Sequence, residues 1–272
     1  MAIDGRSYST VKVGNGTNVK IEYRDFAEST ASIVKEYAQQ GYPDKYVIFT
    51  EHQATSVLTG TKLKEGTLDK GIFMSLLLRP SFLPAQAAVL GPMSVVALIK
   101  ALESYTTKDL GISWVSDVFC EGIKIGGTQI EGKLKDTTSY DYIIITFSAR
   151  LDKKNFPKRL KESVKRVFTQ DNSSNGMMIA KTVLDKFFKA YTNINAVDDQ
   201  IKYYKNKFIL KNVRVKYLDQ NKRRTGTVIG LDEITLSLII KSPGGNEITI
   251  YKHSGVIIPS RIKLSKKTKD KE

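Results

Sequence analysis

The stretch Gly111–Gly132, GISWVSDVFCEGIKIGGTQIEG, contains the pattern on which the fold assignment depends. Trp114 is followed three residues later by Asp117, and Lys124 comes seven residues after this aspartate. A Gly-Gly pair follows the lysine, in what otherwise reads as a β-hairpin; glycines inside a strand indicate a bulge or the close approach of another backbone. The lysine beside them has two interpretations, a solvent-exposed hairpin residue or a cation in a functional site.

Strand patterns surround this stretch on both sides. Alternating or continuous apolar runs predict strands over residues 18–23, 45–50, 71–80, 111–119, 122–134 (the hairpin) and 140–149. Residues 51–70 read as a long loop, and long loops inside compact domains are usually functional or disordered. Several strands follow one another closely, so we expect an α+β fold with a central mixed sheet whose middle strands are antiparallel.

Helical patterns lie between the strands. A helix is predicted over residues 29–41, with Ser29 or Thr30 as its N-cap and Gly41 at its end. An apolar helix over residues 84–105 should kink or split at Pro92, because proline cannot donate a backbone hydrogen bond. Helical periodicity continues from 156 to 204, and its apolar stripe is interpreted as core rather than as a cofactor site.

Composition changes near residue 206, where the helical pattern ends. Four short β-rich runs separated by tight turns follow and predict a small SH3-like barrel. We therefore expect two domains, residues 1–206 and 207–272.

The charge of the chain is unevenly distributed. Of its 272 residues, 1–150 contain 16 Lys/Arg and 16 Asp/Glu, whereas 151–272 contain 27 against 12, so the net charge of +15 comes from the second half. A basic face can bind nucleic acid or an acidic partner. The simpler interpretation, which we favour, is solvated helix faces and the tail KLSKKTKDKE.

Other classes are disfavoured by composition. The apolar runs fall short of the roughly 20 residues that span a bilayer, and the first residues lack a signal peptide, so we expect a cytoplasmic protein without membrane contact. The single Cys120 excludes an internal disulfide, and two histidines, His52 and His253, do not suffice for a structural zinc site.

The order of motifs resembles the biotin protein ligases, from about residue 19 to 261. The family's tryptophan, aspartate and lysine match in register without a gap, and so do the two glycines and the Ile-Glu pair that follow. Ser29-Thr30 matches a Ser-Thr-Asn motif, and Gln53 matches the glutamine of Glu-x-Gln. The resemblance implies a biotin/lipoate ligase-like catalytic domain followed by a small SH3-like barrel, and we expect no N-terminal winged helix.

The resemblance also implies an activity, ATP-dependent adenylation of biotin and its transfer to a lysine of a biotin carboxyl carrier protein. Lys124 would be catalytic, because a lysine between the biotin carboxylate and the ATP α-phosphate offsets their repulsion. The implied biotin-binding residues are Ser29, Thr30, Gln53 and Lys124, and the implied nucleotide-binding residues are Trp114, Asp117, Gly126 and Gly127. The implied substrates are biotin and ATP with Mg²⁺; no protein metal ligands are expected, and a homodimer is left open.

This chain departs from the family in the loop after Gln53. The family has Gly-Arg-Gly-Arg-x-Gly-Arg there, and this chain has Ser-Val-Leu-Thr-Gly-Thr-Lys at residues 56–62. Lys62 and Lys64 restore positive charge, but a lysine does not reproduce the two-pronged hydrogen bonds of arginine. Farther on, Arg150 stands where the family has an asparagine.

Three hypotheses are therefore carried forward. The first is a divergent biotin protein ligase, which we favour, and the second is a catalytically degenerate homologue that binds a ligand or partner through the same fold. The third is nucleic-acid binding by the basic half. Each motif also has a structural interpretation: Ser29 and Thr30 as helix caps, Trp114 as core, and Lys124 as surface.

Overall fold

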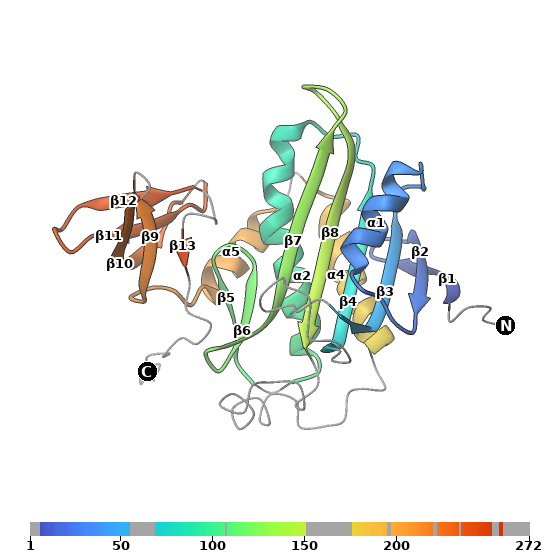
Figure 1. Cartoon of the computed structure of the whole chain (residues 1–272), viewed down its shortest axis with the longest axis horizontal. Helices are drawn as coiled ribbons and strands as arrows, with labels where there is room; N and C mark the ends of the chain where they lie inside the picture. Colours follow the sequence, from blue (N-terminus) through green and yellow to red (C-terminus); the bar gives the residue numbers. More distant parts are fainter. Residues whose placement is uncertain are drawn as a thin grey trace.

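The computed structural model describes residues 6–54, 69–106, 108–150, 176–194, 197–219, 222–233, 235–251 and 256–257. Within these residues the chain forms one eight-stranded sheet and one five-stranded sheet, which Figure 1 shows at opposite ends of the molecule. Helices flank the larger sheet on both faces. The fold is α+β, as the sequence predicts.

The large sheet is mixed, with the strand order β1-β2-β3-β4-β8-β7-β6-β5. Only β2 and β3 are parallel, and the helix α1 connects them; all other neighbours are antiparallel. The antiparallel centre predicted from the sequence is confirmed. The strands are β1 Arg6–Val13, β2 Thr17–Arg24, β3 Tyr46–Gln53, β4 Asp69–Leu78, β5 Leu110–Ser113, β6 Asp117–Cys120, β7 Ile123–Leu134 and β8 Tyr140–Arg150.

Four α-helices are described: α1 Thr30–Gln39, α2 Leu90–Glu103, α4 Gly176–Tyr191 and α5 Asp198–Lys207. Helices α2 and α4 cover one face of the large sheet and enclose the main core, whereas α1 packs on the other face over β3, β4 and β8. The apolar stripe of α4, which includes Val183, Leu184, Phe187 and Phe188, is fully buried, so the prediction of core residues there is confirmed. Residues 156–175 of the predicted helical stretch lie outside the described residues.

Local sequence signals determine where α1 begins and ends. The Oγ of Ser29 accepts a hydrogen bond from the backbone N–H of Ser32 at 3.3 Å, so Ser29 is the N-cap. Gly41 has a φ of +81°, a left-handed conformation that glycine adopts without strain and that ends the helix.

The apolar stretch over residues 84–105 splits as predicted, but between Val89 and Leu90 rather than at Pro92. A 3₁₀ helix, Pro84–Val89, precedes α2, and Pro92 lies in the first turn of α2, where a backbone N–H has no helical partner. By length and composition the stretch Pro84–Glu103 is apolar enough to cross a membrane, contrary to the sequence expectation. Most of this stretch is buried within the protein, as in the core helix of a globular domain.

The expected hairpin with glycines in its middle is corrected by the structure. The turn lies at Glu121 and Gly122, which have φ values of +47° and +79°, and the two glycines lie inside β7. A Cβ on Gly126 would lie 2.1 Å from the carbonyl oxygen of Ser148 on β8, so only glycine fits there. The run 111–119, expected as one strand, forms β5 and β6 with a turn at 114–116, because Trp114 leaves the sheet.

The small sheet has the order β12-β11-β10-β9-β13, and all of its pairs are antiparallel. The four predicted β-rich runs each supply one strand, and β13 adds a fifth. Closure of this sheet into an SH3-like barrel stays an expectation. The strands are β9 Arg214–Asp219, β10 Lys222–Leu231, β11 Leu238–Lys241, β12 Glu247–Ile250 and β13 Val256–Ile257.

The two sheets share an apolar interface. Trp114, in the turn between β5 and β6, and Phe119 on β6 pack in one buried cluster with Leu210 and with Tyr217 and other residues of the small sheet. The indole N–H of Trp114 donates a hydrogen bond of 2.8 Å to the carbonyl oxygen of Leu236. The boundary proposed at residue 206 falls near the end of α5, and neither side of it buries its apolar surface alone.

Candidate functional site

Strand register places two of the predicted site residues, Gly127 and Asp117, at one end of the large sheet. Thr50, Phe73, Ser148, Gly127 and Asp117 lie side by side on β3, β4, β8, β7 and β6. Successive residues of a strand point to opposite faces. Since the neighbours of Ser148 pack in the core beneath α2 and α4, Ser148 itself faces the side of α1. The candidate site is this end of the sheet on the α1 side.

A buried polar cluster lies where α1 begins. The Oε1 of Gln53 accepts hydrogen bonds from the backbone N–H of Thr30 at 3.1 Å and from its Oγ1 at 3.3 Å. The Thr30 hydroxyl also lies 2.9 Å from Ser75 Oγ, which lies 2.9 Å from Thr146 Oγ1. The N-terminus of a helix carries partial positive charge, so this cluster combines hydrogen-bonding groups with an electropositive end. It suits an uncharged polar head group.

The predicted lysine lies on β7 of the same sheet. Lys124 Nζ forms an ion pair of 2.9 Å with Asp117 Oδ1, and each side chain is about one-fifth exposed. A bulge makes Ile125 an extra residue on β7; Ile125 is buried in the main core, whereas Lys124 remains accessible. The lysine is thus neither a free surface residue nor fully buried, and it is held in place by Asp117.

Gly127 is required for this arrangement. A Cβ on Gly127 would lie 2.7 Å from the carbonyl oxygen of Ser116 and 3.1 Å from Asp117 Oδ1. The glycine therefore allows the turn at 114–116 and the Asp117 carboxylate to approach β7. The hydroxyl of Tyr204 on α5 donates a hydrogen bond of 2.7 Å to the carbonyl of Val115 in that turn. Burial, and then the Asp117 carboxylate, raise the pKa of Tyr204, which keeps this donor protonated.

Arg150 adds a second cation at this end of the sheet. It is the last residue of β8, it is 4% exposed, and it pairs in register with Gly71 on β4. A Cβ on Gly71 would lie 2.1 Å from the carbonyl of Ala149, so glycine is needed beside Arg150 as well. The sequence identified Arg150 only as a departure from the family, but the structure places it with the other site residues.

Ser75 and Thr146 were missed from the sequence. The available signal was the polar series Thr146, Ser148 and Arg150 at every second position of an otherwise apolar strand, which indicates one polar face. Ser75 had no such signal, because it stands alone in a continuous apolar run.

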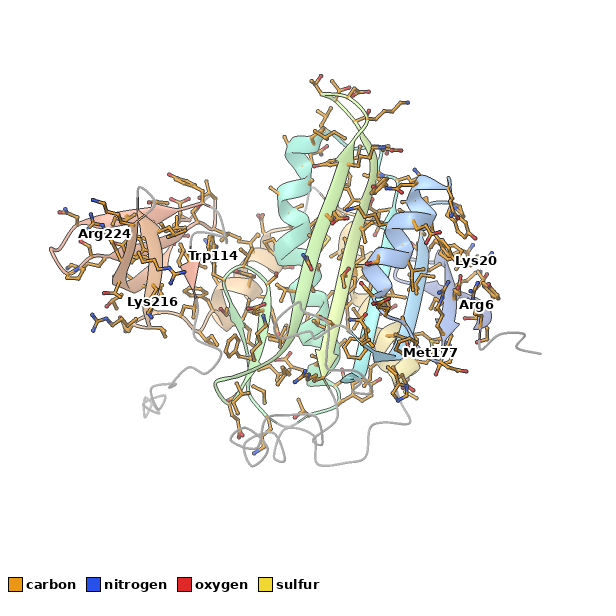
Figure 2. The ribbon with its side chains drawn as sticks, in the orientation of Figure 1. Arg6, Lys20, Trp114, Met177, Lys216 and Arg224 are labelled. Atoms are coloured by element: carbon orange, nitrogen blue, oxygen red, sulfur yellow. The ribbon has the colours of Figure 1, made fainter. Side chains whose placement is uncertain are left out.

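Two of the predicted site residues, Ser29 and Trp114, make contacts that stabilise the fold. The Ser29 hydroxyl caps α1, and the Trp114 ring is buried in the interface between the sheets; Figure 2 shows Trp114 on the side of the small sheet. Gly126 faces the close-packed β8 backbone. Their ligand-binding roles stay predictions. Residues 56–62 and Lys64, the altered loop, lie outside the described residues.

A metal ion in a protein is commonly held by His, Cys, Asp or Glu side chains. Across the described parts of the chain, no group of three or more of them lies together.

Comparisons with known proteins agree with the motifs. No protein-family model matches this chain. Two curated proteins described as bifunctional ligase/repressor BirA, from Bacillus spizizenii and Bacillus subtilis, are 24% identical to it over 160 residues, which is 57% of this chain. The match covers 49% of either relative, so the chain spans about half the length of the curated relatives it matches.

Solved structures resemble the chain over most of its length. Apo biotin protein ligase from Aquifex aeolicus aligns with a TM-score of 0.62 and 18% identity, covering 87% of this chain and 97% of that one. The complex of that enzyme with biotin and ATP gives a TM-score of 0.58 at 18% identity, covering 85% and 95%. Biotin acetyl coenzyme A carboxylase synthetase from Helicobacter pylori, with bound biotinylated ATP, gives 0.55 at 15%, covering 84% and 98%. The chain is therefore biotin protein ligase-like in its fold.

Proposed function

We propose that this protein is a divergent biotin–[acetyl-CoA carboxylase] ligase that adenylates biotin with ATP and transfers it to a lysine of a carrier protein. The observation that carries the proposal is the joint placement of the Thr30–Gln53–Ser75 cluster and the Lys124–Asp117 pair. Both lie at one end of a single sheet, in a fold shared with proteins solved with biotin and ATP.

In this proposal the polar cluster binds the ring system of biotin. Thr30, Gln53 and the N-terminus of α1 supply the few directed hydrogen bonds that orient a mostly apolar ligand. Ser29 adds a hydroxyl at the same helix end.

Lys124 acts on the reacting groups. An oxygen of the biotin carboxylate attacks the α-phosphorus of ATP, forming biotinyl-adenylate and releasing pyrophosphate. The Lys124 ammonium lies between the two anions, lowers their repulsion and stabilises the charge that develops on the phosphate. Asp117 holds the lysine in position through the 2.9 Å ion pair. Mg²⁺ arrives with the nucleotide.

The second step needs an acceptor. The amine of a carrier-protein lysine attacks the acyl carbon of biotinyl-adenylate, an amide bond forms, and AMP leaves. A biotin carboxyl carrier domain in the cytoplasm is the proposed partner.

A binding-only homologue is the second candidate, and a specific observation favours it. The segment after Gln53 has lost every arginine of the family loop, and Ser56, Leu58 and Thr61 stand at its three glycine positions. Glycine and arginine are the residue types that hold phosphate closely. In this version the polar cluster binds a ligand, but no adenylate forms.

The test combines calorimetry and carrier labelling. Biotin and ATP are titrated separately and together, and a biotin carboxyl carrier domain is then incubated with all components and weighed by mass spectrometry. We expect binding of both ligands and the mass increase of one biotin on the carrier. Binding of biotin without carrier labelling selects the binding-only homologue. No binding of either ligand at millimolar concentration contradicts the ligase and favours a homologue that binds a different ligand or a partner.

A further inference from the structure

The small sheet contains a groove that the proposed ligase chemistry does not use. It lies between the β9–β10 hairpin and the turn that joins β11 to β12, and its volume is about 660 Å³. Its walls include three cationic side chains, Lys216, Arg223 and Arg224. Figure 2 shows Lys216 and Arg224 on the small sheet, across the molecule from Arg6 and Lys20.

The groove concentrates positive charge. Within the described part of the chain, Lys216 and Arg223 form no ion pair with an Asp or Glu side chain. Arg214 and Lys222, both exposed, continue the same charge along the hairpin. The small domain as a whole, residues 207–272, has 15 Lys/Arg against 6 Asp/Glu. Such a field attracts an extended polyanion.

Tyr217, one of the residues that line the groove, has a buried hydroxyl. Tyr217 is 1% exposed, and its hydroxyl has no hydrogen-bond partner among the described residues. Buried polar groups in native proteins are almost always paired, so an unpaired one calls for a missing partner. Tyr217 lies opposite Arg224 in the register of β9 and β10, so the two side chains share one face of the small sheet, and both residues line the groove.

The remaining lining groups fit phosphate oxygens. Thr225, Ser242 and Asn246 add hydroxyl and amide donors to the three cations. Arginine, lysine, tyrosine, serine, threonine and asparagine are the residues that contact phosphates in nucleic-acid complexes. The ring of Tyr217 is buried, so it offers no face on which a base could stack. The contacts would therefore be to the backbone and independent of base sequence.

We propose that this groove binds the phosphate backbone of a nucleic-acid strand. The site is separate from the candidate ligase site, so the proposal stands or falls independently of the biotin chemistry. A nucleic acid is favoured over an acidic peptide because a phosphate occurs at every nucleotide, which matches a row of cations that extends beyond the groove.

The proposal is tested with the full chain and fluorescein-labelled 20-nucleotide DNA, single-stranded and duplex, by anisotropy at several NaCl concentrations. We expect affinity to fall steeply with salt, with little effect of base sequence. The double variant K216A/R223A should bind about tenfold more weakly, and the slope of log affinity against log salt should decrease by about two, because two phosphates are no longer neutralised.

A matched control variant distinguishes binding in the groove from attraction by the overall positive charge of the protein. The variant K202A/K211A removes the same net charge from exposed positions outside the groove, and it should bind like the parent protein. Tyr217→Phe removes only the unpaired hydroxyl, so it should weaken binding about threefold without lowering the melting temperature.

Several results would overturn the proposal. These are no binding at 50 mM NaCl, full binding by K216A/R223A, or equal losses of affinity in the groove and control variants. Displacement of the DNA by polyglutamate at equal charge concentration would reassign the groove to an acidic protein. Unchanged binding by Tyr217→Phe would show that the hydroxyl does not contact the nucleic acid.

Discussion

The proposed role of Lys124 depends on the residues that surround it. Its ion pair with Asp117 fixes the ammonium without burying it fully, which suits a group that must meet two anions. Lys124→Ala should slow adenylate formation about a hundredfold or more, because removing one group that stabilises the transition state in this way costs roughly 3 kcal/mol. The rate of pyrophosphate release at saturating biotin and ATP measures the rate of adenylate formation.

The control for that variant is Lys133→Ala, on the same strand. Lys133 is more than half exposed and pairs with Asp141 at 3.0 Å, at the other end of β7. Unchanged adenylation in Lys124→Ala would remove the catalytic role assigned to this lysine.

Cys120 provides a second test at the residue scale. Burial, and then the Glu121 carboxylate, raise the pKa of the Cys120 thiol to about 12 from a usual value of 9.0. The reactive thiolate is therefore suppressed in the folded protein, and we expect no reaction with a disulfide reagent at pH 8 until urea unfolds the chain. The unfolded thiol ionises first, so the free energy of unfolding should decrease as pH rises above about 9.

The reaction is followed by the absorbance of the thiol that the disulfide reagent releases, measured at increasing urea concentrations. Rapid labelling in the absence of urea would show that Cys120 is accessible and that its environment is not the one described.

Among the elements, α1 links the core to the candidate site. Its first residue, Thr30, is fully buried and bridges Gln53 and Ser75. Thr30→Val keeps the shape but removes the hydroxyl, so it should lower the free energy of unfolding by about 1–3 kcal/mol. Biotin affinity, measured by calorimetry on the folded variant, should also fall. Ser32→Ala, an exposed position on the same helix, should change neither quantity.

The segment after β3 allows the opposite kind of experiment, a gain of function. The quadruple variant S56G/V57R/L58G/T59R restores two glycines and two arginines of the family loop. If the protein is a ligase that binds its substrates weakly, this variant should tighten biotin and ATP binding about tenfold, because arginine makes charge-assisted contacts to carboxylate and phosphate. The same four positions changed to alanine provide the control. Equal affinities in the two variants would show that the loop composition does not limit binding.

At the scale of the whole molecule, the two sheets depend on each other. Trp114 and Phe119 are at most 3% exposed, and most of the residues in their buried cluster lie between 208 and 256. A fragment of residues 1–206 would expose both rings, so it should bind a hydrophobic dye, show red-shifted tryptophan emission and lose cooperative unfolding. The full chain is the reference, and because Trp114 is its one tryptophan, the emission reports this interface alone. A fragment that unfolds cooperatively with blue-shifted emission would establish residues 1–206 as an independent domain.

The sequence by itself determined the features that depend on neighbours along the chain. These are the α+β class, an N-cap of α1 at Ser29 or Thr30, its end at Gly41, the buried stripe of α4 and the β-rich end. The reason is that capping, turn conformation and hydrophobic periodicity act over a few residues, so the local sequence contains the information. The order of motifs also singled out Asp117 and Lys124, whose side chains form an ion pair; their functional roles stay predictions.

Only the tertiary structure decided which distant residues meet. Ser75 touches Thr30 and Thr146 across strands more than 40 positions away, a contact that depends on the register of β4. Arg150 lies at the candidate site because of strand register as well, whereas Trp114 packs against the small sheet. A one-residue change in register would turn every side chain of a strand to the other face, so no local pattern determines such contacts.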